Sequence, residues 1–263
     1  MRIKVIITQA KNEQLMTRRL IEQVFTNWVN PELEKRRNED KLPSDFNLKV
    51  AQVIFSVGGL PVVRVNNEVK VIVEAKFNRP VNKGEAIFDR DIEDIRSFKL
   101  IEEERDFGHI TVIRLTKGWF VGFSFIYDVS KSKARYEIAQ EFIKSAHHSL
   151  SNKLYRPFVE SAFIAAENLA KARLFLLPDQ GIRKKRVKHS VTKRKVEMFS
   201  KTGSIIKPEH SDLFVELLKL RDQARYDPGF KLKRLDASKL FDLLKDLNKE
   251  VFLHLVRYGE ISN

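Results

Sequence analysis

The amino-acid sequence predicts an α+β protein with an N-terminal α/β domain that contains antiparallel hairpins and a C-terminal all-α bundle of about five helices. The length of 263 residues exceeds the usual size of one domain, and a hydrophobic content of 43% is enough for two cores. Before residue 130, apolar residues alternate with polar ones or form short runs, as in strands. After residue 133 they recur three and four positions apart, as in helices. We therefore place an α/β domain at 1–130 and a helical domain at 133–263.

The first elements expected in the N-terminal domain are a strand and a helix. Arg2–Thr8 is a short apolar-rich stretch, which is typical of a strand, and the apolar residues of Glu13–Val29 follow helical spacing. The polar and charged segment Glu32–Asp45 is expected to be a loop or a frayed helix. The domain boundary is expected at Val129–Lys133, which is short and polar.

An antiparallel sheet is predicted from short apolar segments and the turns between them. The strands are expected at Lys49–Ser56, Pro61–Val65, Val69–Phe77, His109–Thr116 and Trp119–Tyr127. Asn66-Asn67 is expected to form the tight turn of a hairpin between the second and third strands, and Lys117-Gly118 the turn between the last two. Ile87–Leu100 is predicted to be a helix because its large apolar residues are three positions apart.

Five helices are predicted in the C-terminal domain. They are expected at Ala134–Leu150, Lys153–Leu176, Ser190–Phe199, Pro208–Tyr226 and Lys239–Tyr258. Alanines in the second helix let a neighbouring helix approach its backbone, so the first two helices are expected to pair closely. Pro178, Gly203 and Pro228-Gly229 are expected to end the second, third and fourth helices.

Composition excludes several classes of protein. No run approaches the roughly 18 consecutive apolar residues of a membrane span. The apolar run within Met1–Gln9 is too short for the core of a signal peptide and lacks a cleavage site of small residues. The absence of cysteine excludes disulfide and thiolate chemistry. These features predict a soluble protein of the cytoplasm.

Positive charge is concentrated in the helical domain. The formal net charge is +14, and residues 131–263 hold 28 Lys and Arg against 16 Asp and Glu. The densest stretch contains Arg183, Lys184, Lys185, Arg186, Lys188, Lys193, Arg194 and Lys195. Such a patch favours binding to RNA or another polyanion, which should weaken steeply as salt rises. The alternatives are a solvated loop that only keeps the protein soluble and, with less support, binding to acidic lipid.

The helix expected at Pro208–Tyr226 carries a charge on its apolar face. Helical spacing from Phe214 and Leu217 places Arg221 on the stripe expected to be buried, with Arg225 one turn further on. A guanidinium there needs an anionic partner. Its planar fork suits a phosphate, whereas the alternative is a salt bridge to Glu160, Glu167 or a second copy of the chain.

Several of these segments together resemble the HEPN domain, a helical nucleotide-binding family of higher eukaryotes and prokaryotes. The resemblance covers residues 133 to about 260, and it rests on the alanine-rich helix Ala162–Leu177 and on the segments Lys188-His189-Ser190, Lys201-Thr202-Gly203, Leu220-Arg221 and Tyr226-Asp227-Pro228. It implies a homodimer that binds RNA or nucleotide and needs no cofactor. It also implies a setting in toxin–antitoxin systems or antiviral defence, with a nucleotidyltransferase or another antitoxin-like protein as partner.

The resemblance leaves the question of catalysis open. In catalytic members of the family, an arginine is followed after four to six residues by a histidine. Tyr226 stands where the shortest spacing would put it, and a tyrosine is a poor base because its pKa is near 10. The segment is closer to a branch with an Arg-x-x-Ala-Asp-Tyr signature, except that Arg225 replaces the aspartate. One alternative is a metal-independent endoribonuclease that uses Arg221 with Tyr226 or a histidine from elsewhere. Another is a non-catalytic protein-interaction module.

A further alternative places a metal-dependent nuclease in the N-terminal domain. Glu74 and Lys76 resemble the Glu-x-Lys element of PD-(D/E)xK nucleases, in which carboxylates hold the metal. The preceding strand lacks the expected aspartate, and strand alternation alone explains why both side chains are polar. The primary expectation is therefore that the protein uses no metal. The sequence identifies no family for residues 1–130.

Overall fold

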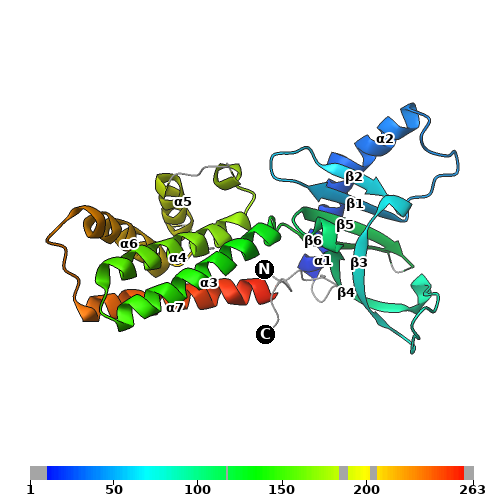
Figure 1. Ribbon diagram of the computed structural model, residues 1–263. Helices are drawn as coiled ribbons and strands as arrows, with labels where there is room; N and C mark the ends of the chain where they lie inside the picture. Colours follow the sequence, from blue (N-terminus) through cyan, green and yellow to red (C-terminus); the bar gives the residue numbers. More distant parts are fainter. Residues whose placement is uncertain (1–10, 117, 184–188, 202–205, 258–263) are drawn as a thin grey trace. The chain divides into compact units, whose positions relative to one another are not determined.

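The chain divides into two compact units, Met1–Tyr127 and Asp128–Asn263 (Figure 1). The computed structural model describes residues 11–116, 118–183, 189–201 and 206–257, so the strand expected at 2–8 lies outside the described residues. The first unit combines helices with antiparallel strands and the second consists of helices, which confirms the predicted α+β class. In the described part of the chain, no helix is long and apolar enough to cross a membrane.

A long helix forms the start of the first unit. It consists of α1 (Lys11–Val24), a π-helical turn η1 (Phe25–Val29) and α2 (Asn30–Asn38). Pro31 lacks the N–H of a normal helical residue, and the wider turn just before it accommodates this loss. The helix therefore continues into the segment 32–45, whose first part we had expected to be a loop or a frayed helix. Arg36 fixes its end through Glu68 (2.7 Å) and the carbonyl of Val63 (3.1 Å).

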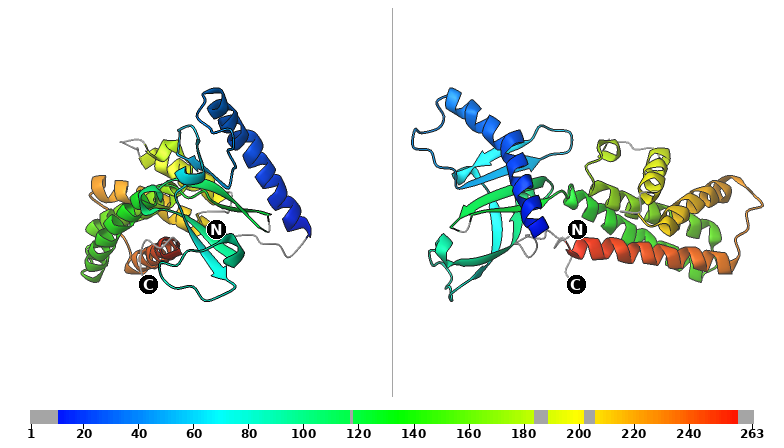
Figure 2. Two further views of the ribbon diagram at one scale, coloured as in Figure 1. Left: turned by 90° about the vertical axis from the view of Figure 1, so that its right-hand side faces the viewer. Right: turned by 180° about the vertical axis from the view of Figure 1, so that it is seen from behind.

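This long helix packs on a four-stranded antiparallel sheet (Figure 2). The sheet has the order β2-β1-β5-β6, with β1 at Val50–Phe55, β2 at Val62–Val65, β5 at Gly108–Leu115 and β6 at Gly118–Ser124. The core between helix and sheet contains Val24, Val29, Leu33, Ala51, Val53, Val65, Ile110, Val112 and Val121. Strands β5 and β6 form the expected hairpin, although residue 117 of its turn lies outside the described residues.

Two predictions for this unit are wrong. The turn at Asn66 does not join a hairpin, because β2 pairs with β1, and β3 (Val71–Phe77) leaves to pair with β4 (Ile92–Leu100). Asn66 instead anchors the turn by accepting hydrogen bonds from the backbone N–H groups of Lys49 and Val50. The helix expected at 87–100 is mostly strand β4.

Two irregularities in the pairing of β3 with β4 explain the second error. Opposite β3, strand β4 contains an extra residue at Glu93 and another at Arg96. Each extra residue shifts the alternation of side chains by one position. Ile95 and Phe98 are therefore both buried although they are three residues apart, a spacing that is normally typical of a helix.

Phe98 joins the two-stranded pair to the larger sheet. Its ring is fully buried against Gly122 of β6, where an added Cβ would lie 2.0 Å from the Phe98 Cδ2 atom. Glycine at position 122 therefore allows the ring to approach the strand backbone.

We expect Gly122→Ala to lower the free energy of unfolding of the N-terminal unit by about 1–3 kcal/mol, because the new methyl group forces Phe98 to move. Urea unfolding followed by tryptophan fluorescence measures this, since both tryptophans lie in that unit. The double variant Gly122→Ala with Phe98→Leu should lose less than the sum of the two single variants. Additive losses would contradict the proposed contact.

A buried polar group lies within the larger sheet. His109 Nδ1 is 3.0 Å from Thr111 Oγ1, and the Gln52 side chain donates to the same hydroxyl and to the carbonyl of Lys70. Burial lowers the pKa of His109 to about 4, because the surroundings disfavour a charged imidazole.

His109 should make the N-terminal unit less stable in acid. The unfolded chain binds a proton near pH 6.5 and the folded chain only near pH 4, so stability is full above pH 6.5 and falls as pH is lowered through this window. This group should contribute a loss of roughly 3 kcal/mol between pH 7 and pH 4. Urea unfolding across this range should show a smaller loss in His109→Gln. Equal pH dependence in the two proteins would refute the assignment.

The second unit is a bundle of five described α-helices (Figure 1). They are α3 (Val129–Ser151), α4 (Tyr155–Phe175), α5 (His189–Lys201), α6 (Pro208–Tyr226) and α7 (Arg234–Arg257). Helices α3 and α4 pack together along their length, as expected. Val129–Lys133, which we expected to link the domains, is the beginning of α3. Helix α4 also contacts α5, α6 and α7, and most of its residues are buried.

Candidate functional site

Arg221 lies in the interior of the bundle, as the helical spacing predicts. Its side chain is 14% exposed, and its Nε lies 3.4 Å from Glu160 Oε2 on α4. The guanidinium carbon sits 4.7 Å from the centre of the Phe163 ring, a cation–π contact. Nε is buried and has no hydrogen-bond partner within the described residues. The pair with Glu160 is one of the salt bridges that the sequence suggested.

Arg225 binds the same carboxylate from one turn further along α6. Its Nε and Nη2 donate to the two oxygens of Glu160, the second at 2.7 Å. Glu160 raises the pKa of Arg225, so the guanidinium stays charged. The Arg225 side chain is 41% exposed, and the neighbouring Tyr226 is largely exposed at the end of the helix. Two cations therefore share one anion at this end of α6.

The end of α6 is held by a third arginine. Arg156 of α4 donates to the backbone carbonyls of Ala224, Asp227 and Pro228, and its guanidinium lies 5.3 Å from the centre of the Phe230 ring. These carbonyls lie in the last turn of the helix or directly after it, and they would otherwise need water as a partner. Arg156 thus fixes the segment that carries Arg225 and Tyr226.

His189 of α5 contacts the ring of Phe163, which Arg221 of α6 also contacts. It begins α5, and its ring packs edge-on against Phe163 with centres 5.3 Å apart. Its Nδ1 lies 2.6 Å from Glu167 Oε1, and Lys171 pairs with that oxygen at 3.0 Å. Phe163 therefore lies in contact with both His189 and Arg221, which are 32 positions apart in the sequence.

The other predicted basic residues lie before α5 and on α5. Arg183 donates to the Asp128 carboxylate and to the backbone carbonyls of Asp179 and Phe175, so it closes the end of α4. Lys184, Lys185, Arg186 and Lys188 lie outside the described residues. On α5, Arg194 is exposed and Lys193 lies 3.8 Å from Glu197.

Glu74 and Lys76 form contacts that a strand surface explains. Glu74 accepts a hydrogen bond from Ser97 at 3.1 Å, and Lys76 pairs with Glu93 at 2.8 Å, both across the β3–β4 pair. In the part of the chain that the structure describes, Glu74 belongs to no group of three side chains placed to hold a metal ion. The arrangement gives the metal-nuclease alternative no support.

Sequence reasoning identified the cations of this site more easily than the residues that hold them. Glu160 was an expected partner of Arg221, whereas Glu167 pairs with His189 and Phe163 was not singled out. The available signal was their spacing, because positions 160, 163 and 167 fall on one face of a helix. We call Glu160, Phe163, Glu167, His189, Arg221 and Arg225 the α4–α6 cluster.

Comparison with protein-family models identifies the helical unit. The family model of the HEPN domain matches residues 132–251, which covers most of the second unit and all of the α4–α6 cluster. No curated protein matches the chain.

The shared anion of the cluster should matter more for stability than the exposed arginine. We expect Glu160→Gln to lower the free energy of unfolding by about 2 kcal/mol, because it leaves the mostly buried Arg221 without its anion. Arg225→Ala should lower it much less, because this residue is exposed to water. Urea unfolding followed by circular dichroism measures which of the two variants loses more stability. A larger loss in Arg225→Ala would contradict this expectation.

Proposed function

The C-terminal unit is a HEPN domain, and from this premise we propose that the protein binds RNA or nucleotide phosphates through Arg221, Arg225 and the adjoining basic residues. The observation that carries the proposal is the sharing of one carboxylate by two guanidiniums. Glu160 neutralises only one of the two charges, so the group of Glu160, Arg221 and Arg225 keeps one positive charge.

The geometry of the two arginines suits a phosphate. Glu160 already accepts two parallel hydrogen bonds from Arg225, which is the way in which arginine binds carboxylate and phosphate alike. Phe163 and Glu160 hold Arg221 in place, so little side-chain entropy remains to be lost on binding. Glu160 then acts as an internal competitor that a phosphate must displace from Arg225.

Charge outside the cluster supports a polymer rather than a single nucleotide. Positions 171–201 contain 11 basic residues and two acidic ones. Several phosphates in a row can meet such a surface, and each contact releases counterions. We assign the exposed Arg194 to this outer surface, and Arg221 with Arg225 to the inner contact. Lys184, Lys185, Arg186 and Lys188 belong to the same basic stretch of the sequence but lie outside the described residues.

Because Glu160 competes with the phosphate, replacing Glu160 and replacing Arg225 should change the affinity for RNA in opposite directions. Glu160→Gln should tighten binding of a single-stranded RNA about threefold to tenfold, because both arginines lose their internal anion. Arg225→Ala should weaken it and reduce the slope of log affinity against log salt by about one. Fluorescence anisotropy across a salt series measures both quantities.

A matched control separates the site from general charge. Lys245→Ala removes one positive charge from an exposed position on α7 and should leave the affinity within about twofold of wild type. Equal effects of Arg225→Ala and Lys245→Ala would reduce the interaction to non-specific attraction. Absence of binding even at low salt would overturn the proposal and favour a protein-interaction module.

The placement of His189 favours a second candidate function, a metal-independent endoribonuclease. His189 is half-exposed, and Glu167 holds one ring nitrogen, which leaves the other nitrogen to exchange a proton with a ribose hydroxyl. In this candidate mechanism His189 takes the place of Tyr226 as the base, since tyrosine is a weak base at neutral pH. Cleavage in the presence of chelator, lost in His189→Ala but kept in His148→Ala, would support this candidate.

Family membership also supports proposals about the setting. We infer a homodimer in the cytoplasm that takes part in toxin–antitoxin systems or antiviral defence, with a nucleotidyltransferase or another antitoxin-like protein as partner. Light scattering of the purified chain tests the dimer.

A further inference from the structure

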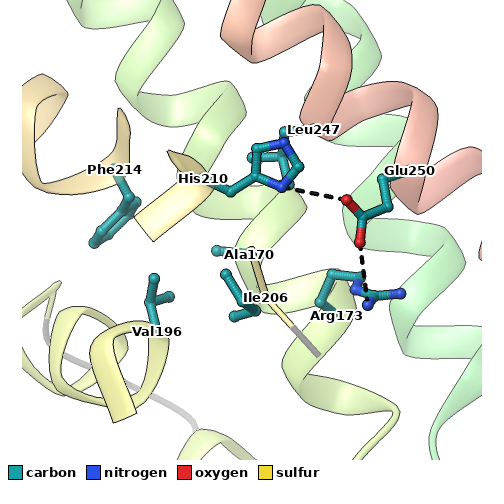
Figure 3. A pocket seen from close by; sticks show the side chains of 8 residues that line it. All are labelled: Ala170, Arg173, Val196, Ile206, His210, Phe214, Leu247 and Glu250. Carbon is teal, nitrogen blue, oxygen red and sulfur yellow. Dashed lines mark hydrogen bonds and ion pairs between the residues drawn. The ribbon is translucent and has the colours of Figure 1, made fainter. Parts of the chain in front are cut away.

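A second cluster of ionisable side chains joins the beginning of α6 to α7 (Figure 3). His210 lies in the first turn of α6, and Asp246 and Glu250 are one turn apart on α7. One donor atom from each of these three residues lies within 4.8 Å of the others. His210 is 11 positions before Arg221 on the same helix, so the cluster is separate from the phosphate site proposed above.

The cluster contains a buried imidazole nitrogen that makes no hydrogen bond among the described residues. The imidazole of His210 is 1% exposed, with Nε2 at 2.9 Å from Asp246 Oδ2 and Nδ1 at 3.4 Å from Glu250 Oε2. Nδ1 is buried without a hydrogen bond among the described residues. A neutral imidazole has only one N–H, so it cannot donate to both carboxylates. A buried nitrogen left without a hydrogen bond is costly, and a cation bound between the groups would satisfy it.

We propose that His210, Asp246 and Glu250 bind a divalent transition-metal ion such as Zn²⁺. One imidazole nitrogen and two carboxylate oxygens are a normal ligand set for this ion, and three protein ligands leave one position for water. Oε1 of Glu250 lies 3.5 Å from Nη2 of Arg173, and this contact fixes the orientation of the carboxylate. The cavity beside the cluster is otherwise lined by apolar side chains, among them Phe214 and Leu247 (Figure 3).

Lys207 shows that the cluster already attracts a cation. Its Nζ lies 3.3 Å from Asp246 Oδ2 and 3.2 Å from Glu250 Oε2, the same two oxygens that face His210. Its side chain is half-exposed on a flexible stem, which lets it leave when a metal ion binds. Lys207 therefore competes with the metal.

Titration of the full-length chain, first freed of metal with chelator, with Zn²⁺ in a calorimeter tests the proposal. Wild type should bind one equivalent of Zn²⁺ at this site, with a rise in the thermal midpoint because the ion joins two helices. Lys207→Gln should bind Zn²⁺ about tenfold more tightly. Asp246→Asn should bind at least tenfold more weakly, and this half-exposed position allows the variant to fold. His210→Gln should lose the site.

A control variant with His147→Ala and His148→Ala removes two exposed histidines of α3 and should bind Zn²⁺ as wild type does. Absence of binding in both wild type and Lys207→Gln would overturn the proposal. Unchanged affinity in Asp246→Asn and His210→Gln would also overturn it, because the ion would then lie elsewhere. RNA binding is measured separately, so failure of either proposal leaves the other intact.

Discussion

The C-terminal unit depends on the burial of α4, which other helices contact on several sides. A helix in this position cannot point charged side chains to water, so each polar group that it carries must find a partner on a neighbour. Glu160 pairs with Arg221 and Arg225 of α6, and Glu167 pairs with His189 of α5. The polar residues of α4 thereby set the positions of basic side chains on both neighbouring helices.

Phe163 contributes to this arrangement in a different way. It lies between the two acidic positions on the same face of α4, and its ring makes a T-shaped contact with His189 and carries Arg221 over its face. Aromatic rings present negative charge on the face and positive charge at the edge, so the face suits the guanidinium. The ring also keeps water away from Arg221, which strengthens the attraction between this arginine and Glu160. Packing and electrostatics here depend on the same side chain.

The sequence predicted helices better than strands, and cations better than their partners. Helical spacing located α3 to α7 and placed Arg221 on a buried face, because a regular period persists over many residues. Strand β4 was missed because extra residues at Glu93 and Arg96 turn its alternation into a three-residue spacing. The hairpin expected at Asn66 failed for another reason, since a turn sequence does not specify which strand its neighbour will pair with. Contacts such as Phe163 with His189 depend on helix packing, which local patterns do not contain.

The same rule of charge matching operates at both ends of α6 with opposite sign. At its end, two arginines share one carboxylate, which is the basis of the proposed anion site. Near its beginning, Asp246 and Glu250 converge on His210 and hold Lys207, so the cluster attracts a cation. In each case a side chain of the protein already occupies the place of the ligand, Glu160 in one and Lys207 in the other. Removing that internal occupant should therefore strengthen binding, which a purely structural salt bridge would not do.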